Sequence, residues 1–128
     1  MSEEGAESII GIDLGMTSVV AAHVSAPGQP PEVIPAERGA PALASVVAFR
    51  ERERPVVGRA ARDMITTHPG RTITGIKRLL GRKATSQAVQ DLAARVGFGI
   101  ESGDGGRAVV RVDDRDIDVP EVAALLLT

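Results

Sequence analysis

The amino-acid sequence predicts a mixed α/β domain with an N-terminal β-hairpin and flanking helices. Short β-branched runs, divided by Gly and Pro turns, indicate strands near both ends of the chain. Between them, apolar residues recur at helical spacing. The length of 128 residues and the hydrophobic content of 43% are typical of one small domain, and no apolar run is long enough to predict a membrane span.

Composition limits the partners that the sequence predicts. The net charge is -2 with both signs mixed along the chain, which gives no electrostatic reason to expect nucleic acid or a membrane as a partner. The chain has no Cys and no secretory leader pattern, which predicts a cytoplasmic location. The acidic residues 1–7 are expected to form a disordered tail.

The expected strands lie in two groups. The first group begins with a hairpin, 8–13 and 18–24, and continues after a loop that is rich in Pro and Gly with 32–35 and 45–49. The second group follows the helices and has turns of Gly and Asp between its members; it comprises 98–102, 107–112 and 115–119.

The expected helices are four. They span 56–67, 71–83, 86–97 and 118–128. Thr85 or Ser86 would cap the third helix, and Gly81 stands where a left-handed residue would end the second. The apolar face of the last helix has no evident partner within the chain, so we expect it to be exposed.

Asp13 stands at the end of the first strand, directly before a Gly turn. A buried carboxylate at this place would need a cation or hydrogen-bond donors, which suggests a neighbouring metal or phosphate. An Asp that caps the turn explains the same pattern about equally well. Gly15 would let the backbone approach a ligand, and successive amides of the turn would form an anion-binding concavity to which Thr17 adds a hydroxyl.

Lys77 is the candidate for a second phosphate contact. Its ammonium group could reach a terminal phosphate as a point charge. Taken alone, it is more simply explained as a basic residue near a helix end, where the helix dipole favours cations.

Three stretches taken together resemble one family, the DnaK-type seventy-kilodalton heat-shock chaperones, at the start of their ATPase domain. They are "IIGIDLGMTSVVA" (9–21), "VVGRAARDMITTHPGRTITGIKRLLGR" (56–82) and "VPEVAALLL" (119–127). The resemblance spans about residues 9–127. It implies an actin-like, ribonuclease-H-like ATPase fold, of which 8–128 would be an incomplete, truncated N-terminal portion in the first part of lobe I.

The resemblance also implies roles for particular residues. Asp13 matches the acid that orders the Mg²⁺ shell through water, and Lys77 matches the catalytic lysine that orients the attacking water. The loop that cradles the β- and γ-phosphates of ATP or ADP is matched by Gly15, Met16, Thr17 and Ser18. The family usually has Thr at the position of Met16.

The resemblance implies a parent protein that couples ATP hydrolysis to binding of unfolded polypeptide clients, together with co-chaperones. The second phosphate loop and the adenosine pocket of the family would lie beyond residue 128, so this chain alone is expected to have little or no ATPase activity. Two alternatives remain open. One is a stand-alone, non-catalytic interaction module that uses the last helix, and the other is the start of an actin-like or sugar-kinase ATPase.

Overall fold

The computed structural model describes residues 8–128, and the predicted tail of residues 1–7 lies outside them. The strands are β1 Ile10–Leu14, β2 Ser18–His23, β3 Glu32–Ile34, β4 Leu43–Ala44, β5 Val47–Ala48, β6 Val56–Val57, β7 Thr72–Ile73, β8 Gly99–Ser102, β9 Ala108–Val112 and β10 Arg115–Asp118. The α-helices are α1 Arg59–Arg62, α2 Ile76–Leu79, α3 Gln87–Ala93 and α4 Val119–Leu126. Short 3-10 turns cover Glu37–Gly39, Pro69–Arg71 and Asp104–Gly106.

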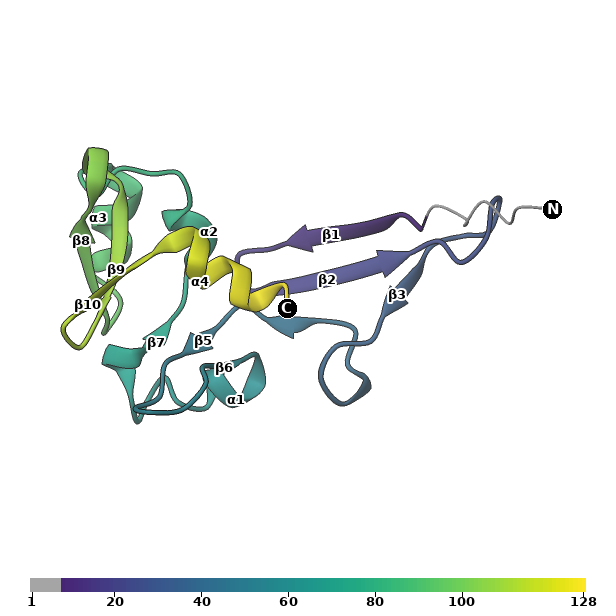
Figure 1. The fold of residues 1–128 in the computed structure, drawn as a ribbon, viewed down its shortest axis with the longest axis horizontal. Coiled ribbons are helices and arrows are strands. Elements are labelled where there is room, and N and C mark those ends of the chain that lie inside the picture. The colour runs from purple at the N-terminus through teal and green to yellow at the C-terminus, as the bar shows by residue number, and fades with distance from the viewer. Residues whose placement is uncertain (1–7) are drawn as a thin grey trace.

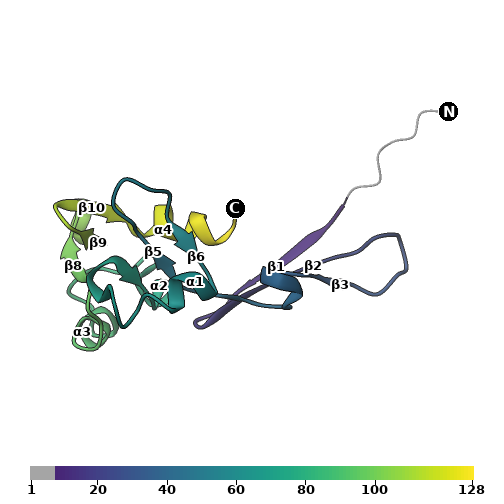
Figure 2. The same ribbon diagram turned by 90° about the horizontal axis from the view of Figure 1, so that it is seen from below.

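The predicted N-terminal hairpin is confirmed. β1 and β2 pair antiparallel, with Asp13 opposite Val20, and β3 and β4 both pair with β2. Strands β1–β3 extend away from the rest of the molecule as a single layer (Figure 1). Figure 2 shows that the helices α1–α4 lie in the body of the molecule and not over this layer. The apolar side chains of β1 are accordingly exposed, and Ile10 and Ile12 keep 57% and 53% of their surface accessible, whereas Val19 of β2 is buried in the main core.

The remaining strands form two small antiparallel sheets in the body of the molecule. One has the order β6–β5–β7, and the other has the order β10–β9–β8, which confirms the three strands expected after the helices. Helices α2 and α4 contact each other, and α4 also packs on β5, β9 and β10. Side chains of these elements form the main core, including Val47, Ile73, Val110 and Val122, each with 0% exposure.

The last helix, α4, was expected to have an exposed apolar face, but that face is buried in the structure. Pro120 lies in its first turn as predicted, but its apolar face is not left open. The side chains of Val119, Val122, Ala123 and Leu126 are buried against the sheets and α2. The expectation of an unpartnered helix was wrong because sequence spacing shows that a face is apolar without showing which distant strands cover it.

The second predicted helix, 71–83, is much shorter in the structure. Thr72 and Ile73 form β7 and pair with Ala48 and Val47 of β5. Gly75 then adopts a left-handed conformation, with φ of 66°, and forms the N-terminal boundary of α2. The helical spacing of the apolar residues was real, but pairing with β5 and the glycine divide the stretch into a strand and one helical turn. Gly81 has the left-handed conformation that was expected of it.

The other helix boundaries also differ. The helix predicted at 56–67 begins with β6, which pairs with β5, and only Arg59–Arg62 is α-helical. The third helix begins after Ser86, whose hydroxyl accepts a hydrogen bond from the amide of Val89 as expected for a cap. It ends at Ala93 rather than 97.

Between residues 8 and 128, no helix has the length and apolarity needed to cross a bilayer.

Candidate functional site

The turn between β1 and β2 has two free backbone donors. The amide of Gly15 donates to the carbonyl oxygen of Ser18 at 2.9 Å, which closes the turn. Within the described residues, the next two amides, of Met16 and Thr17, donate to no backbone or side-chain acceptor. Both residues are exposed. Two successive free amides in a tight turn form the kind of concavity that binds an anion.

Residue 15 must be Gly because the backbone of Ser18 lies too close for a side chain, and not because of the backbone dihedral angles of residue 15. A Cβ atom on residue 15 would lie 2.5 Å from the carbonyl oxygen of Ser18, which is closer than any real Cβ contact. A side chain at this position would therefore force the turn open and change the direction of the amides of residues 16 and 17.

Ser45 supports the turn from outside the hairpin and was missed by the sequence analysis. Its hydroxyl donates to the carbonyl oxygen of Gly15 at 3.2 Å, and its amide donates to the carbonyl oxygen of Thr17 at 2.9 Å. The residue is only 4% exposed. The sequence signal was a lone hydroxyl residue inside the apolar run "LASVVAF", because a buried polar side chain needs a partner.

Asp13 lies beside the turn, in β1, and its side chain is exposed. The sequence argument that burial would make this carboxylate costly was wrong, because Asp13 lies in the part of β1 that is exposed to solvent. No cluster of three or more His, Cys, Asp or Glu side chains suited to a metal occurs in residues 8–128. A Mg²⁺ ion beside the single carboxylate of Asp13 would have to take most of its ligands from phosphate and water oxygens.

Lys77 is positioned by α2. The neighbouring residues Ile76 and Leu79 are 2% and 1% exposed, and their burial fixes the helical turn so that Lys77 faces solvent. Lys77 and Met16 line one cavity of about 480 Å³. The fold thus joins the hairpin turn to the predicted lysine, although the two are far apart in the sequence. Asp13, Gly15, Thr17 and Ser18 do not line this cavity and lie next to it in the hairpin.

The charge of this cavity is strongly positive. The residues that line it include Lys77, Arg78, Arg82 and Arg95, and Asp91 is the one acidic residue of the lining within the described chain. These basic residues suit a ligand that carries several negative charges.

The fold and the site together define a mixed α/β domain in which Met16 of a glycine turn and Lys77 of α2 line one basic cavity. The model of the Hsp70 protein family matches residues 9–128, and the chain belongs to this family. The antiparallel sheets and flanking helices are those of part of the family's actin-like ATPase domain. Membership associates the chain with chaperones that bind ATP.

Proposed function

We propose that the chain is the start of the ATPase domain of a DnaK-type chaperone and binds the phosphates of Mg·ATP at the β1–β2 turn. The observation that carries the proposal is that Met16 and Lys77 line one cavity. Met16 belongs to the glycine turn and Lys77 to the basic helix. Their presence in one cavity supports a shared role in binding phosphate.

The backbone amides of Met16 and Thr17 would hold phosphate oxygens. Both amides lack other partners within residues 8–128, and Ser45 holds the carbonyl groups of the same turn, so the donors are already oriented before a ligand arrives. Replacement of the family's usual Thr by Met16 leaves this backbone contact intact, because an amide donor does not depend on its side chain.

Lys77 would place its charge beside the terminal phosphate and orient the attacking water. Bound Mg²⁺ would neutralise phosphate charge, and Asp13 would orient the water molecules around the ion. Phosphoryl transfer depends mainly on such positioning and charge neutralisation. In the parent protein this chemistry would drive the binding and release of unfolded polypeptides, in the cytoplasm and with co-chaperones.

The experiment is a matched comparison of the two lysines of the sequence, Lys77 and Lys83. Lys83 also lies near α2 and is exposed, but it does not line the cavity. Equilibrium binding of Mg·ATP should weaken about tenfold in Lys77→Gln, as expected for loss of one charge-assisted phosphate contact, and change less than about twofold in Lys83→Gln. Equal effects of the two variants would show that Lys77 acts only through net charge.

A further inference from the structure

One edge of β1 is open along its whole length. Among the described strands β1 pairs only with β2, and it stands first in the order β1–β2–β3. Hydrogen bonds join Ile9 to Val24 at one end of the β1–β2 ladder and Gly15 to Ser18 at the other. Because bonded and non-bonded pairs alternate along an antiparallel ladder, these two bonds fix which residues of β1 direct their backbone groups toward β2.

Three residues of β1 direct their backbone groups away from β2. In this alternation Gly11 and Asp13 bond to β2, whereas Ile10, Ile12 and Leu14 point to the open edge. Within residues 8–128, the backbone of these three residues forms no hydrogen bond to a group outside the ladder. A row of unpaired N–H and C=O groups therefore faces solvent, which is the usual template for pairing with another strand.

The same three residues make one face of β1 apolar. Side chains two positions apart share a face of a strand, so Ile10, Ile12 and Leu14 lie together. Ile10 and Ile12 are exposed, and Leu14 is half-buried against the main core. A strand that pairs with this edge would thus gain backbone hydrogen bonds and apolar cross-strand contacts at the same positions.

The two edges of the layer differ in their protection. β3 has only three residues, includes Glu32 and is flanked by Pro31 and Pro35. Short length, charge and proline are the devices that keep an edge strand from pairing. β1 has five residues, and the segment 8–14 contains no Pro, Lys or Arg. The sequence therefore blocks the edge at β3 and leaves the edge at β1 available.

We infer that the open edge of β1 pairs with β1 of a second copy of this chain, antiparallel and about a two-fold axis at Ile12. This register places Ile12 opposite Ile12 of the second copy and Ile10 opposite its Leu14. All three outward-facing residues of each copy then exchange backbone hydrogen bonds. On the other face Asp13 lies opposite Gly11 of the second copy, so the two carboxylates are not directly opposed. The strand is its own complement, which favours a second copy over an unrelated peptide.

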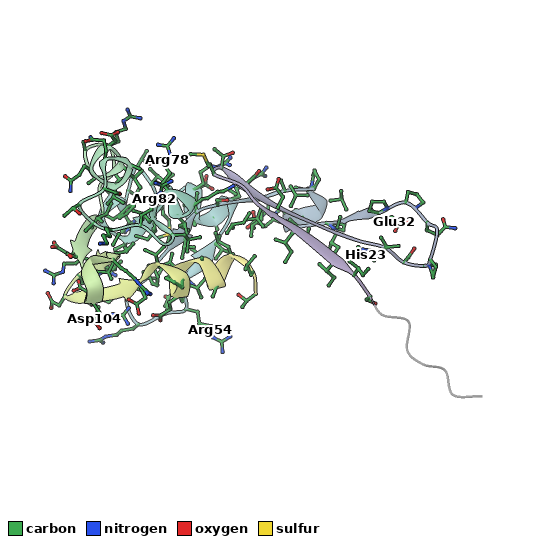
Figure 3. All side chains as sticks on the ribbon, turned by 90° about the horizontal axis from the view of Figure 1, so that it is seen from above. His23, Glu32, Arg54, Arg78, Arg82 and Asp104 are labelled. Carbon is green, nitrogen blue, oxygen red and sulfur yellow. The ribbon has the colours of Figure 1, made fainter. Side chains whose placement is uncertain are left out.

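The shape of the molecule permits this pairing. Figure 3 shows His23 and Glu32 at the end of the layer that is remote from the body, and Ile10 lies opposite His23 in the ladder. Leu14 lies at the other end, where it packs on the core. In an antiparallel pair the two bodies would therefore lie at opposite ends of a continuous sheet with the order β3–β2–β1–β1–β2–β3. A contact between two strands of five residues is smaller than the standard interface of about 800 Å² per partner, so we expect a weak dimer with a Kd of about 10–100 µM.

Sedimentation equilibrium of the 128-residue chain over a range of concentrations is the first test. Ile12→Lys should weaken dimerisation at least about tenfold, because it places two ammonium groups opposite each other at the two-fold axis. Val33→Lys is the matched control, since Val33 is 47% exposed on β3 of the same layer and the charge change is identical. It should change the Kd less than about twofold.

Amide hydrogen exchange, followed by nuclear magnetic resonance, tests the register. Exchange at Ile10, Ile12 and Leu14 should slow as the concentration rises through the Kd, whereas the amides of Gly11 and Asp13 should be protected in monomer and dimer alike. A chain that stays monomeric up to about 1 mM would overturn the inference. It would also be overturned by equal effects of Ile12→Lys and Val33→Lys, or by a dimer in which the three outward amides gain no protection.

Discussion

Ser45 and Gly15, 30 positions apart in the sequence, are joined by a hydrogen bond of 3.2 Å from the serine hydroxyl to the glycine carbonyl oxygen. The bond connects the β1–β2 turn to the segment between β4 and β5, and Ser45 is almost fully buried there. The orientation of the turn amides therefore depends on a residue outside the turn.

Replacement of Ser45 by Ala should lower the free energy of unfolding by about 1–2 kcal/mol, because the bonded hydroxyl is lost and the turn becomes less constrained. Urea denaturation measures this change. Ser102→Ala is the matched control, since Ser102 is exposed on β8, and its effect should stay within about 0.5 kcal/mol. If the two variants have the same stability, the buried bond does not constrain the turn.

Gly15→Ala should both destabilise the protein and weaken binding of Mg·ATP. The added Cβ would lie 2.5 Å from the carbonyl oxygen of Ser18, so the turn must open. Gly11→Ala is the control on the preceding strand, β1, where a Cβ meets nothing within 4 Å. We expect a loss of at least about 1 kcal/mol for Gly15→Ala and none for Gly11→Ala, measured by denaturation. Equal stability of both variants would contradict the tight turn.

The sequence predicted the hairpin and a helix cap but not the long-range contacts that hold the β1–β2 turn in place. The hairpin followed from β-branched runs around a Gly turn, and the cap at Ser86 followed from local chemistry. The bond from Ser45 to Gly15 and the meeting of Met16 with Lys77 depend on long-range folding, which single-sequence periodicity does not report. The roles of Asp13 and Lys77 came from the resemblance to the family, and they remain predictions.

Gly75→Ala should destabilise the protein more than Gly81→Ala. Both glycines have positive φ, so both variants carry a backbone penalty of about 1 kcal/mol. At Gly75 the new methyl group would also lie 2.9 Å from a terminal carbon of Leu92, whereas at Gly81 it meets nothing within 4 Å. Thermal denaturation of the two variants measures the difference. A larger loss for Gly81→Ala would show that α2 and α3 are not packed as described.

Leu126→Ala and Leu127→Ala test whether α4 is covered by the chain itself. Leu126 is 4% exposed, and its truncation should cost about 2–5 kcal/mol. Leu127 is 51% exposed, and its truncation should change stability by less than about 0.5 kcal/mol. Similar, small effects of both variants would restore the expectation from the sequence that the apolar face of this helix is free.

The most direct test of phosphate binding at the β1–β2 turn is a nuclear magnetic resonance titration of the ¹⁵N-labelled chain with Mg·ATP. The method detects weak binding, and it reports each backbone amide separately. We predict that the largest amide shifts occur at Met16 and Thr17, whose amides have no partner within the described chain, with smaller shifts around Lys77. Gly105 and Gly106, in the turn between β8 and β9, serve as internal references and should not shift. Saturable shifts confined to residues outside the turn and the cavity, or no shifts at millimolar Mg·ATP, would contradict the proposed site.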